Sequence, residues 1–153
     1  MLFLVLPVQG QQNQNIPVMD FPTLEPWLHK SDDTTYILNF WATWCVPCRR
    51  ELPHFERIHR EHSGDALKVV LVSLDFPQQI ESTVIPFLEK NSITAQVILL
   101  NDPNSNVWID KVDTSWSGSI PATLLYNREK RIFLEKELDY EKIREILNEF
   151  INP

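Results

Sequence analysis

From Phe21 onward, short apolar runs alternate with longer segments in which apolar residues recur at helical spacing. This alternation is typical of a layered α/β domain. The apolar runs predict strands at Thr34–Phe40, Leu67–Leu74, Gln96–Leu100, Thr123–Tyr126 and Arg131–Glu137. The unbroken run of the second strand indicates that both of its faces are covered. The turn-like residues 127–130 indicate that the last two strands form a hairpin.

The helical spacing predicts five helical segments. The first is capped by Thr23 and runs through Trp27 and Leu28, the second opens at Pro47 and Cys48, and the third spans about Gln78–Asn91. The fourth covers Asn104–Val112 and is expected to point Val107, Trp108 and Val112 inward. The last starts at Asp139 and buries Ile143, Ile146, Leu147 and Phe150. We expect Pro53 to kink the second segment, because proline removes a backbone donor. Pro86 interrupts the third.

Size and composition predict one water-soluble domain. The chain has 153 residues, of which 43% are hydrophobic and 23% are charged, so it has enough apolar material for a core. We assign residues 21–153 to this domain and residues 1–20 to a signal remnant or a flexible leader. The composition predicts no stable membrane span in the mature chain. The net charge of −7 opposes nucleic-acid binding, which requires a basic surface.

The N-terminal segment bears on the cellular compartment. Leu2–Leu6 is a short apolar run, and Val8, Gln9 and Gly10 place small or apolar residues at the positions that a signal peptidase reads. Against a complete signal peptide, the first basic residue is Lys30 and the apolar run is short. We therefore predict a periplasmic or otherwise extracytoplasmic protein with a truncated signal peptide. The alternative is a cytoplasmic protein with a disordered or docked N-terminal arm.

The two cysteines, Cys45 and Cys48, are three residues apart, a spacing that about one in 80 random placements in this chain would give. They lie where the first predicted strand gives way to a helix. A helix N-terminus lowers the pKa of a thiol and so favours the thiolate, which is the nucleophile. We expect Cys45 to attack a substrate disulfide and the more buried Cys48 to resolve the mixed disulfide. Val46 and Pro47 stiffen the turn between them.

Two structural roles for the cysteine pair remain open. One is a closed structural disulfide, although so short a loop constrains the unfolded chain only weakly. The other is a zinc site, which would need further ligands from His54, His59 and His62. Those histidines lie in a charged helical stretch, where a solvated face is the commoner explanation. We expect no metal, and no cofactor other than the redox-active Cys45–Cys48 disulfide.

The run from Asn39 to Pro53, Asn-Phe-Trp-Ala-Thr-Trp-Cys-Val-Pro-Cys-Arg-Arg-Glu-Leu-Pro, resembles the active-site segment of the thioredoxin superfamily. It is most similar to the extracytoplasmic TlpA/ResA-like branch, which includes the cytochrome c maturation reductases. Val72–Asp75 and Gly118–Thr123 extend the resemblance. It implies a thioredoxin fold, with a central mixed β-sheet, a C-terminal β-hairpin and helices on both faces of the sheet.

The resemblance also implies roles for residues around the cysteines. Pro121 corresponds to the cis-proline that faces them, and the Ile120 backbone would then pair with an extended substrate peptide. An ordinary trans proline is the alternative that the residue by itself favours. Trp44 and Pro47 are expected on the substrate-facing surface. Trp41 suits either that surface or the core.

Asn39 departs from cytosolic thioredoxins, which resemble this segment but carry a proton-transferring aspartate at this position. Glu51 lies one turn beyond Cys48 on the same helical face, and the TlpA/ResA-like branch has a glutamate there that is implicated in the chemistry. We predict that burial raises the Glu51 pKa and that Glu51 accepts the Cys48 proton. The alternative is a first-turn glutamate that only complements the helix dipole. Arg49 and Arg50 are expected to be solvated.

These features predict an enzyme, a thiol-disulfide oxidoreductase that reduces protein disulfides outside the cytosol. The resemblance makes apocytochrome c a candidate substrate. Because compartments outside the cytosol are oxidising, such a reductase would need a membrane electron donor for its own re-reduction. One alternative is a peroxiredoxin-like peroxidase, against which the adjacent resolving cysteine argues. Another is a redox-inactive thioredoxin-fold binding module, which the intact cysteine pair makes less suitable.

Overall fold

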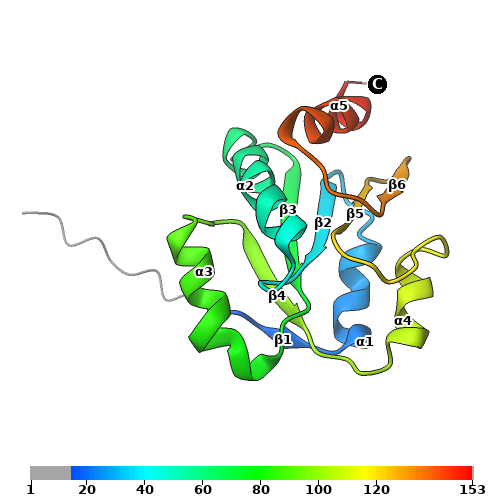
Figure 1. The fold of residues 1–153 in the computed structure, drawn as a ribbon. Helices are drawn as coiled ribbons and strands as arrows, with labels where there is room; N and C mark the ends of the chain where they lie inside the picture. The colour runs from blue at the N-terminus through cyan, green and yellow to red at the C-terminus, as the bar shows by residue number, and fades with distance from the viewer. Residues whose placement is uncertain (1–14, 153) are drawn as a thin grey trace, which may run out of the picture.

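A computed structural model describes residues 15–152 of the protein. In this part of the chain, six strands form one mixed sheet in the order β1-β4-β3-β2-β5-β6 (Figure 1). The strands are β1 (Val18–Met19), β2 (Thr35–Trp41), β3 (Leu67–Ser73), β4 (Gln96–Leu100), β5 (Ala122–Tyr126) and β6 (Arg131–Leu134). Strands β1, β4, β3 and β2 pair in parallel, whereas β5 pairs antiparallel with both β2 and β6. The predicted C-terminal hairpin, formed by β5 and β6, is confirmed.

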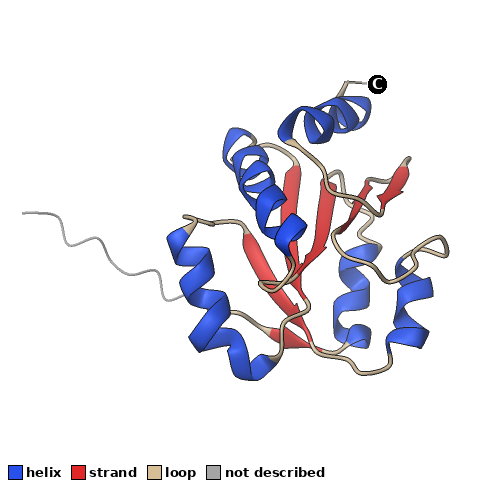
Figure 2. Cartoon of the chain, in the orientation of Figure 1, coloured by secondary structure: helices blue, strands red, loops and turns tan. Residues whose placement is uncertain are grey.

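Helices cover both faces of the sheet, as predicted (Figure 2). They are α1 (Phe21–Leu24), α2 (Val46–Glu61), α3 (Ile85–Lys90), α4 (Ser105–Val112) and α5 (Tyr140–Ile151). Successive side chains of a strand point to opposite faces. Ile37 of β2 therefore joins the core that contains α2, α3 and α5, while its neighbour Leu38 joins the core that contains α1 and α4. Strand β2 is thus buried on both sides, and its C-terminal end leads into α2.

The N-terminal cap of α1 differs from the prediction. Asp20, not Thr23, is the cap residue, and its carboxylate accepts hydrogen bonds from the Thr23 amide at 3.0 Å and the Thr23 hydroxyl at 2.6 Å. Pro22 stands in the first turn, a position where its missing amide has no helical partner to lose. The helix therefore begins earlier than predicted and continues as a 3₁₀ turn at Glu25–Leu28.

Prolines also divide the helical segment predicted at about Gln78–Asn91. It consists of a 3₁₀ turn at Pro77–Gln79, a π-helical turn at Ile80–Val84 and then α3, which begins next to Pro86. In contrast, α2 continues as one helix through Pro53. The predicted inward position of Val107 on α4 is wrong because this side chain is 60% exposed, whereas Trp108 and Val112 are buried as predicted.

The edge strand β1 lies inside the segment predicted as a signal remnant or leader. Val18 and Met19 pair with β4, and Ile16 is buried in the core. The sheet therefore begins before residue 21, and a two-residue strand is too short to show the alternation that marks strands in a sequence. The predicted signal features of residues 1–10 lie outside the described residues. Among the helices of residues 15–152, none is long and apolar enough to cross a membrane.

Candidate active site

The end of β2 and the start of α2 hold the cysteine pair at a helix N-terminus. Cys45 is the N-cap residue of α2, and its Sγ accepts a hydrogen bond from the Cys48 amide at 3.3 Å. A disulfide bond joins the two residues. Cys45 keeps 7% of its surface exposed and Cys48 keeps none, so the predicted order of burial is confirmed. In the reduced protein, the same amide and the helix dipole favour a thiolate on Cys45.

Asp75 anchors the loop that carries Cys45. Its carboxylate is buried and accepts hydrogen bonds from the Thr43 amide at 3.1 and 3.2 Å and from the Thr43 hydroxyl at 2.5 Å. The Ser73 hydroxyl donates to the same carboxylate at 2.7 Å. In the sequence, Asp75 stands out only as part of the family resemblance, which does not indicate this contact. A polar residue directly after a buried parallel strand is a signal for such a role, because sites gather at the carboxyl ends of these strands.

The loop before β5 also lies next to the cysteine pair. The Ile120–Pro121 peptide bond is cis, as the resemblance implies, and the Ile120 carbonyl oxygen lies 3.8 Å from Cys45 Sγ. Glu135 ties this loop to the rest of the domain by accepting hydrogen bonds from the hydroxyl and the amide of Ser117. These bonds lower the Glu135 pKa, because they stabilise its ionised form. The loop backbone is thereby held beside Cys45.

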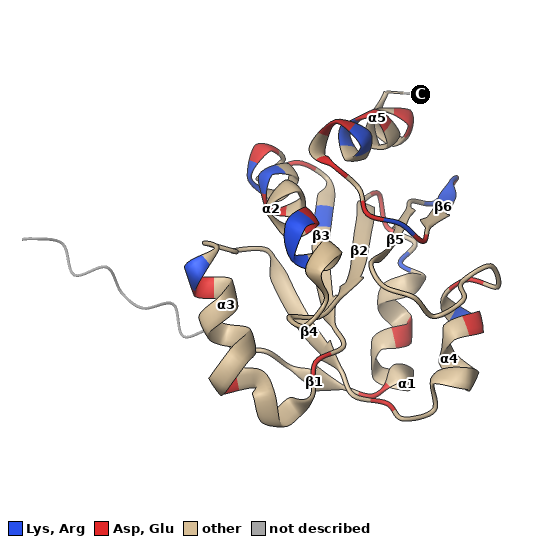
Figure 3. Cartoon of the chain, viewed as in Figure 1, with Lys and Arg blue, Asp and Glu red and all other residues tan. Residues whose placement is uncertain are grey.

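Exposed aromatic side chains lie on the two loops next to Cys45. Trp44 is 62% exposed, and Pro47 is partly exposed in the first turn of α2. Phe76, which follows Asp75, is 65% exposed and was not predicted as a site residue. Trp41 belongs to the core, where its ring centroid lies 5.5 Å from that of Phe87. Residues 41–48, 76–80 and 114–121 contain no charged side chain, whereas charged residues lie along α2 and α5 (Figure 3).

Glu51 is fully buried on α2, one turn beyond Cys48. Its Oε1 accepts a hydrogen bond from Asn39 Nδ2 at 2.6 Å, and its Oε2 accepts one from the Leu138 amide at 2.9 Å. Burial raises the pKa of Glu51 to about 7, because desolvation outweighs these two bonds to the ionised form. The alternative of a first-turn glutamate is wrong, since the first turn of α2 contains no acidic residue. Glu51 therefore lies in the interior, and its pKa is raised as predicted.

Asn39 joins Glu51 to the sheet. Besides the bond to Glu51, its Nδ2 donates to the Thr123 hydroxyl of β5 at 3.1 Å. Asn39 Oδ1 is buried without a hydrogen-bond partner in the described structure. Asn39 itself does not titrate, but it donates a hydrogen bond to the Glu51 carboxylate, which does. The sequence did not indicate this contact.

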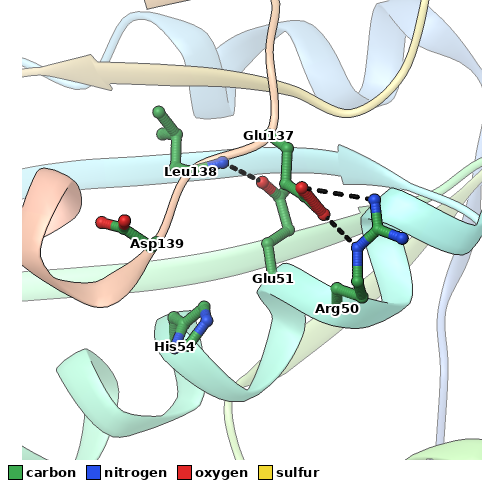
Figure 4. A pocket seen from close by; sticks show the side chains of 6 residues that line it. All are labelled: Arg50, Glu51, His54, Glu137, Leu138 and Asp139. Atoms are coloured by element: carbon green, nitrogen blue, oxygen red, sulfur yellow. Dashed lines mark hydrogen bonds and ion pairs between the residues drawn. The ribbon is translucent and has the colours of Figure 1, made fainter.

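A polar pocket of about 250 Å³ lies on the α5 side of Glu51. It is lined by Arg50, Glu51, His54, Glu137, Leu138 and Asp139 (Figure 4). Arg50, expected to be solvated, is indeed exposed but also pairs with Glu137, with its Nε 2.6 Å and its Nη2 3.3 Å from the two carboxylate oxygens. In residues 15–152, no group of three or more His, Cys, Asp and Glu side chains is arranged to hold a metal ion.

Comparisons with known proteins agree with this geometry. The family model described as the AhpC/TSA family matches residues 25–133. Sporulation thiol-disulfide oxidoreductase A of Bacillus subtilis is 38% identical over 63 residues, which cover 41% of this chain and 38% of that relative. The thiol-disulfide oxidoreductase ResA of Halalkalibacterium halodurans is 28% identical over 123 residues, or 80% of this chain and 65% of that relative. The chain thus spans less than two thirds of the length of either curated relative.

Solved structures show the same fold. The crystal structure of StoA from Bacillus subtilis matches with a TM-score of 0.54 and 28% identity, covering 75% of this chain and 83% of that chain. The thioredoxin-related protein of Neisseria meningitidis serogroup B matches with a TM-score of 0.67 and 20% identity, covering 82% of this chain and 89% of that chain. The predicted α/β thioredoxin fold is therefore confirmed.

Proposed function

The chain belongs to the thioredoxin-like AhpC/TSA family, and on that premise we propose that it is a thiol-disulfide oxidoreductase acting through Cys45 and Cys48. The observation that carries the proposal is the position of Cys45 Sγ. This sulfur accepts a hydrogen bond from the Cys48 amide at the start of α2 and lies 3.8 Å from the Ile120 carbonyl oxygen. The sulfur is thus placed where a thiolate is favoured and where an extended peptide can pair with backbone.

In the reducing direction, the Cys45 thiolate attacks one sulfur of a substrate disulfide. A Cys45–substrate disulfide forms, the substrate S–S bond breaks, and the other substrate sulfur leaves as a thiolate. The Cys48 thiol then gives its proton to the Glu51 carboxylate and attacks Cys45 Sγ. The Cys45–Cys48 disulfide forms and the second substrate thiolate leaves. Two electrons pass to the substrate, and one proton remains on the enzyme.

Glu51 suits the role of proton acceptor for Cys48. The two residues share a face of α2, and a pKa of about 7 matches Glu51 to work near neutral pH. For the substrate, we propose a protein segment that lies against Trp44, Pro47, Ile120 and Pro121. Trp44 is exposed and Ile120 partly exposed, and an uncharged surface suits an extended chain with apolar residues near its cysteine.

We further propose that the protein is a reductase outside the cytosol, and that a membrane electron donor reduces its disulfide again. The short apolar run at residues 2–6 and the resemblance to an extracytoplasmic branch support this location. The same resemblance keeps apocytochrome c as the candidate substrate. A redox titration against glutathione tests the direction, because a reductant requires a midpoint well below that of the glutathione pool.

Trapping the intermediate tests the chemistry. Cys48→Ala should accumulate mixed disulfides through Cys45 when the reduced protein meets insulin, because the resolving thiol is absent. Cys45→Ala is the matched variant and should accumulate none. Adducts through Cys48 in the Cys45→Ala protein would reverse the two roles. Turnover of hydrogen peroxide but not of insulin would support a peroxidase, and no turnover of either with both thiols free would support a docking module.

A further inference from the structure

The burial of its neighbours limits the directions in which Glu51 can exchange a proton with water. On the sheet side, Asn39 and Thr123 have no exposed surface, and neither has Cys48 on α2. On the α5 side, Glu51 lines the polar pocket together with Arg50, His54, Glu137, Leu138 and Asp139. Solvent-accessible polar groups therefore surround Glu51 on the pocket side only, because its polar neighbours on the sheet side are fully buried.

The groups that cover Glu51 on the pocket side are themselves exposed. The side chains of Arg50 and Glu137 are 63% and 39% exposed, and together they form the ion pair drawn in Figure 4. Exposed ion pairs contribute little stability, so separating this one costs little. A small rearrangement of surface side chains would therefore bring water to Glu51, whereas the sheet side would require opening of the core.

His54 lies in the same pocket and supplies a proton acceptor. It follows Glu51 by one turn of α2 and is partly exposed. Imidazole exchanges protons readily around neutral pH. The other charged groups at this wall are Arg50 on α2 and Glu137 and Asp139 on the segment before α5, while the polar neighbours from the sheet, Asn39 and Thr123, do not titrate in this range.

We propose that the proton taken up by Glu51 leaves through this pocket, past the Arg50–Glu137 ion pair, with His54 as its first acceptor. This inference rests on the proposed function, because the proton comes from the Cys48 thiol. In atoms, the Glu51 O–H bond breaks, a His54 N–H bond forms, and the imidazolium then gives the proton to water. No electrons move in this step. His54 acts as a positioning residue, since it serves the cysteines only through Glu51.

A rapid-mixing experiment with the reduced full chain and the aromatic disulfide dithiobis-nitrobenzoate tests the proposal. The first thiolate released reports the attack by Cys45, and the second reports closure by Cys48. In His54→Ala we expect the first release to be unchanged and the second to slow at pH 7, up to the roughly 100-fold that a positioned proton acceptor contributes. Added imidazole should restore the second release, which a purely structural defect would not allow.

His59→Ala is the matched control, because His59 is also a partly exposed histidine of α2 but does not line the pocket. It should release both thiolates at the wild-type rates. The proposal is overturned if His54→Ala also shows wild-type rates for the second release at every pH, or if imidazole fails to restore a slowed release. If the wild-type protein releases no thiolate at all, the proposed oxidoreductase function fails and this inference falls with it.

Discussion

Replacing Glu51 with glutamine removes a buried carboxyl group that changes its charge near neutral pH. The folded-state pKa is about 7, against an ordinary value of 4.5 that applies to the unfolded chain. Below pH 4.5 both states hold the proton, and above pH 7 neither does. Between these values only the folded state holds it, so the free energy of unfolding falls as pH rises, by about 1.4 kcal/mol per pH unit and about 3 kcal/mol in all.

The glutamine variant is free of this loss. Its side chain keeps one oxygen to accept the Leu138 amide, and its amide can donate to the otherwise unpartnered Asn39 Oδ1 after that side chain rotates. Glu51→Gln therefore resembles the protonated wild-type protein. We expect it to be close to the wild type in stability at pH 4.5 and more stable by about 3 kcal/mol at pH 8.

Urea unfolding of the oxidised protein at a series of pH values measures this difference, and the disulfide keeps the cysteines from titrating. Ile58→Val is the control, because Ile58 is a buried residue of α2 whose truncation costs about 1 kcal/mol equally at every pH. A constant difference between Glu51→Gln and wild type across the series would refute the reasoning, since it would mean that Glu51 titrates alike in the folded and unfolded states.

Three other predictions concern the surroundings of the site. Asp75→Asn should cost about 1–3 kcal/mol in urea unfolding and slow the first thiolate release, because the amide cannot accept all the hydrogen bonds of the anchored loop. Phe76→Ala should slow the reduction of insulin about tenfold but leave the rate of reduction of a small disulfide unchanged, as expected if the ring contributes about 1.4 kcal/mol to docking of a protein substrate. Val107 is exposed on α4, and the control variant Val107→Ala should change neither rate. Asn39→Asp should steepen the loss of stability with rising pH by up to about 1.4 kcal/mol per pH unit, measured as for Glu51→Gln, because two carboxyls so close cannot both ionise.

Elements with a strong local period were predictable from the sequence. The bounds of β4, Gln96–Leu100, agree with the prediction, and α5 buries the predicted apolar face behind its predicted cap, Asp139. Both depend on signals within a few residues, namely an unbroken apolar run and a capped amphipathic segment. These predictions agree with the structure because the apolar residues that form the pattern are the residues that become buried.

The segments with proline were harder to predict. Asp20, Pro22 and Thr23 together fit a cap followed by a proline in the first turn, whereas the prediction placed the cap at Thr23. In residues 77–91, the apolar spacing is helical, yet Pro86 lacks the amide that one continuous helix would need at that position. The chain therefore passes through three kinds of turn, which apolar spacing alone does not distinguish.

The cysteine pair of the proposed active site could be identified from the sequence because its spacing is local, whereas the residues that support it could not. Asp75 lies 32 residues from the loop that it anchors, and the Leu138 amide lies 87 residues from the Glu51 carboxylate that it contacts. The family resemblance indicated that Glu51 and the cis-proline matter. It did not indicate what holds them, because those contacts depend on how β3 and the segment before α5 pack against α2.

The pairing of Asn39 with Glu51 explains why this chain carries an amide where cytosolic thioredoxins carry an aspartate. The two side chains are 2.6 Å apart and fully buried, so two carboxylates in these positions would repel strongly. One of the two residues must therefore be neutral or hold a proton. An amide on β2 leaves the titrating group on α2, at the wall of the pocket, whereas an aspartate on β2 would place it in the interior of the sheet. The exchange thus places the proposed proton acceptor at the wall of the pocket, one helical turn beyond Cys48.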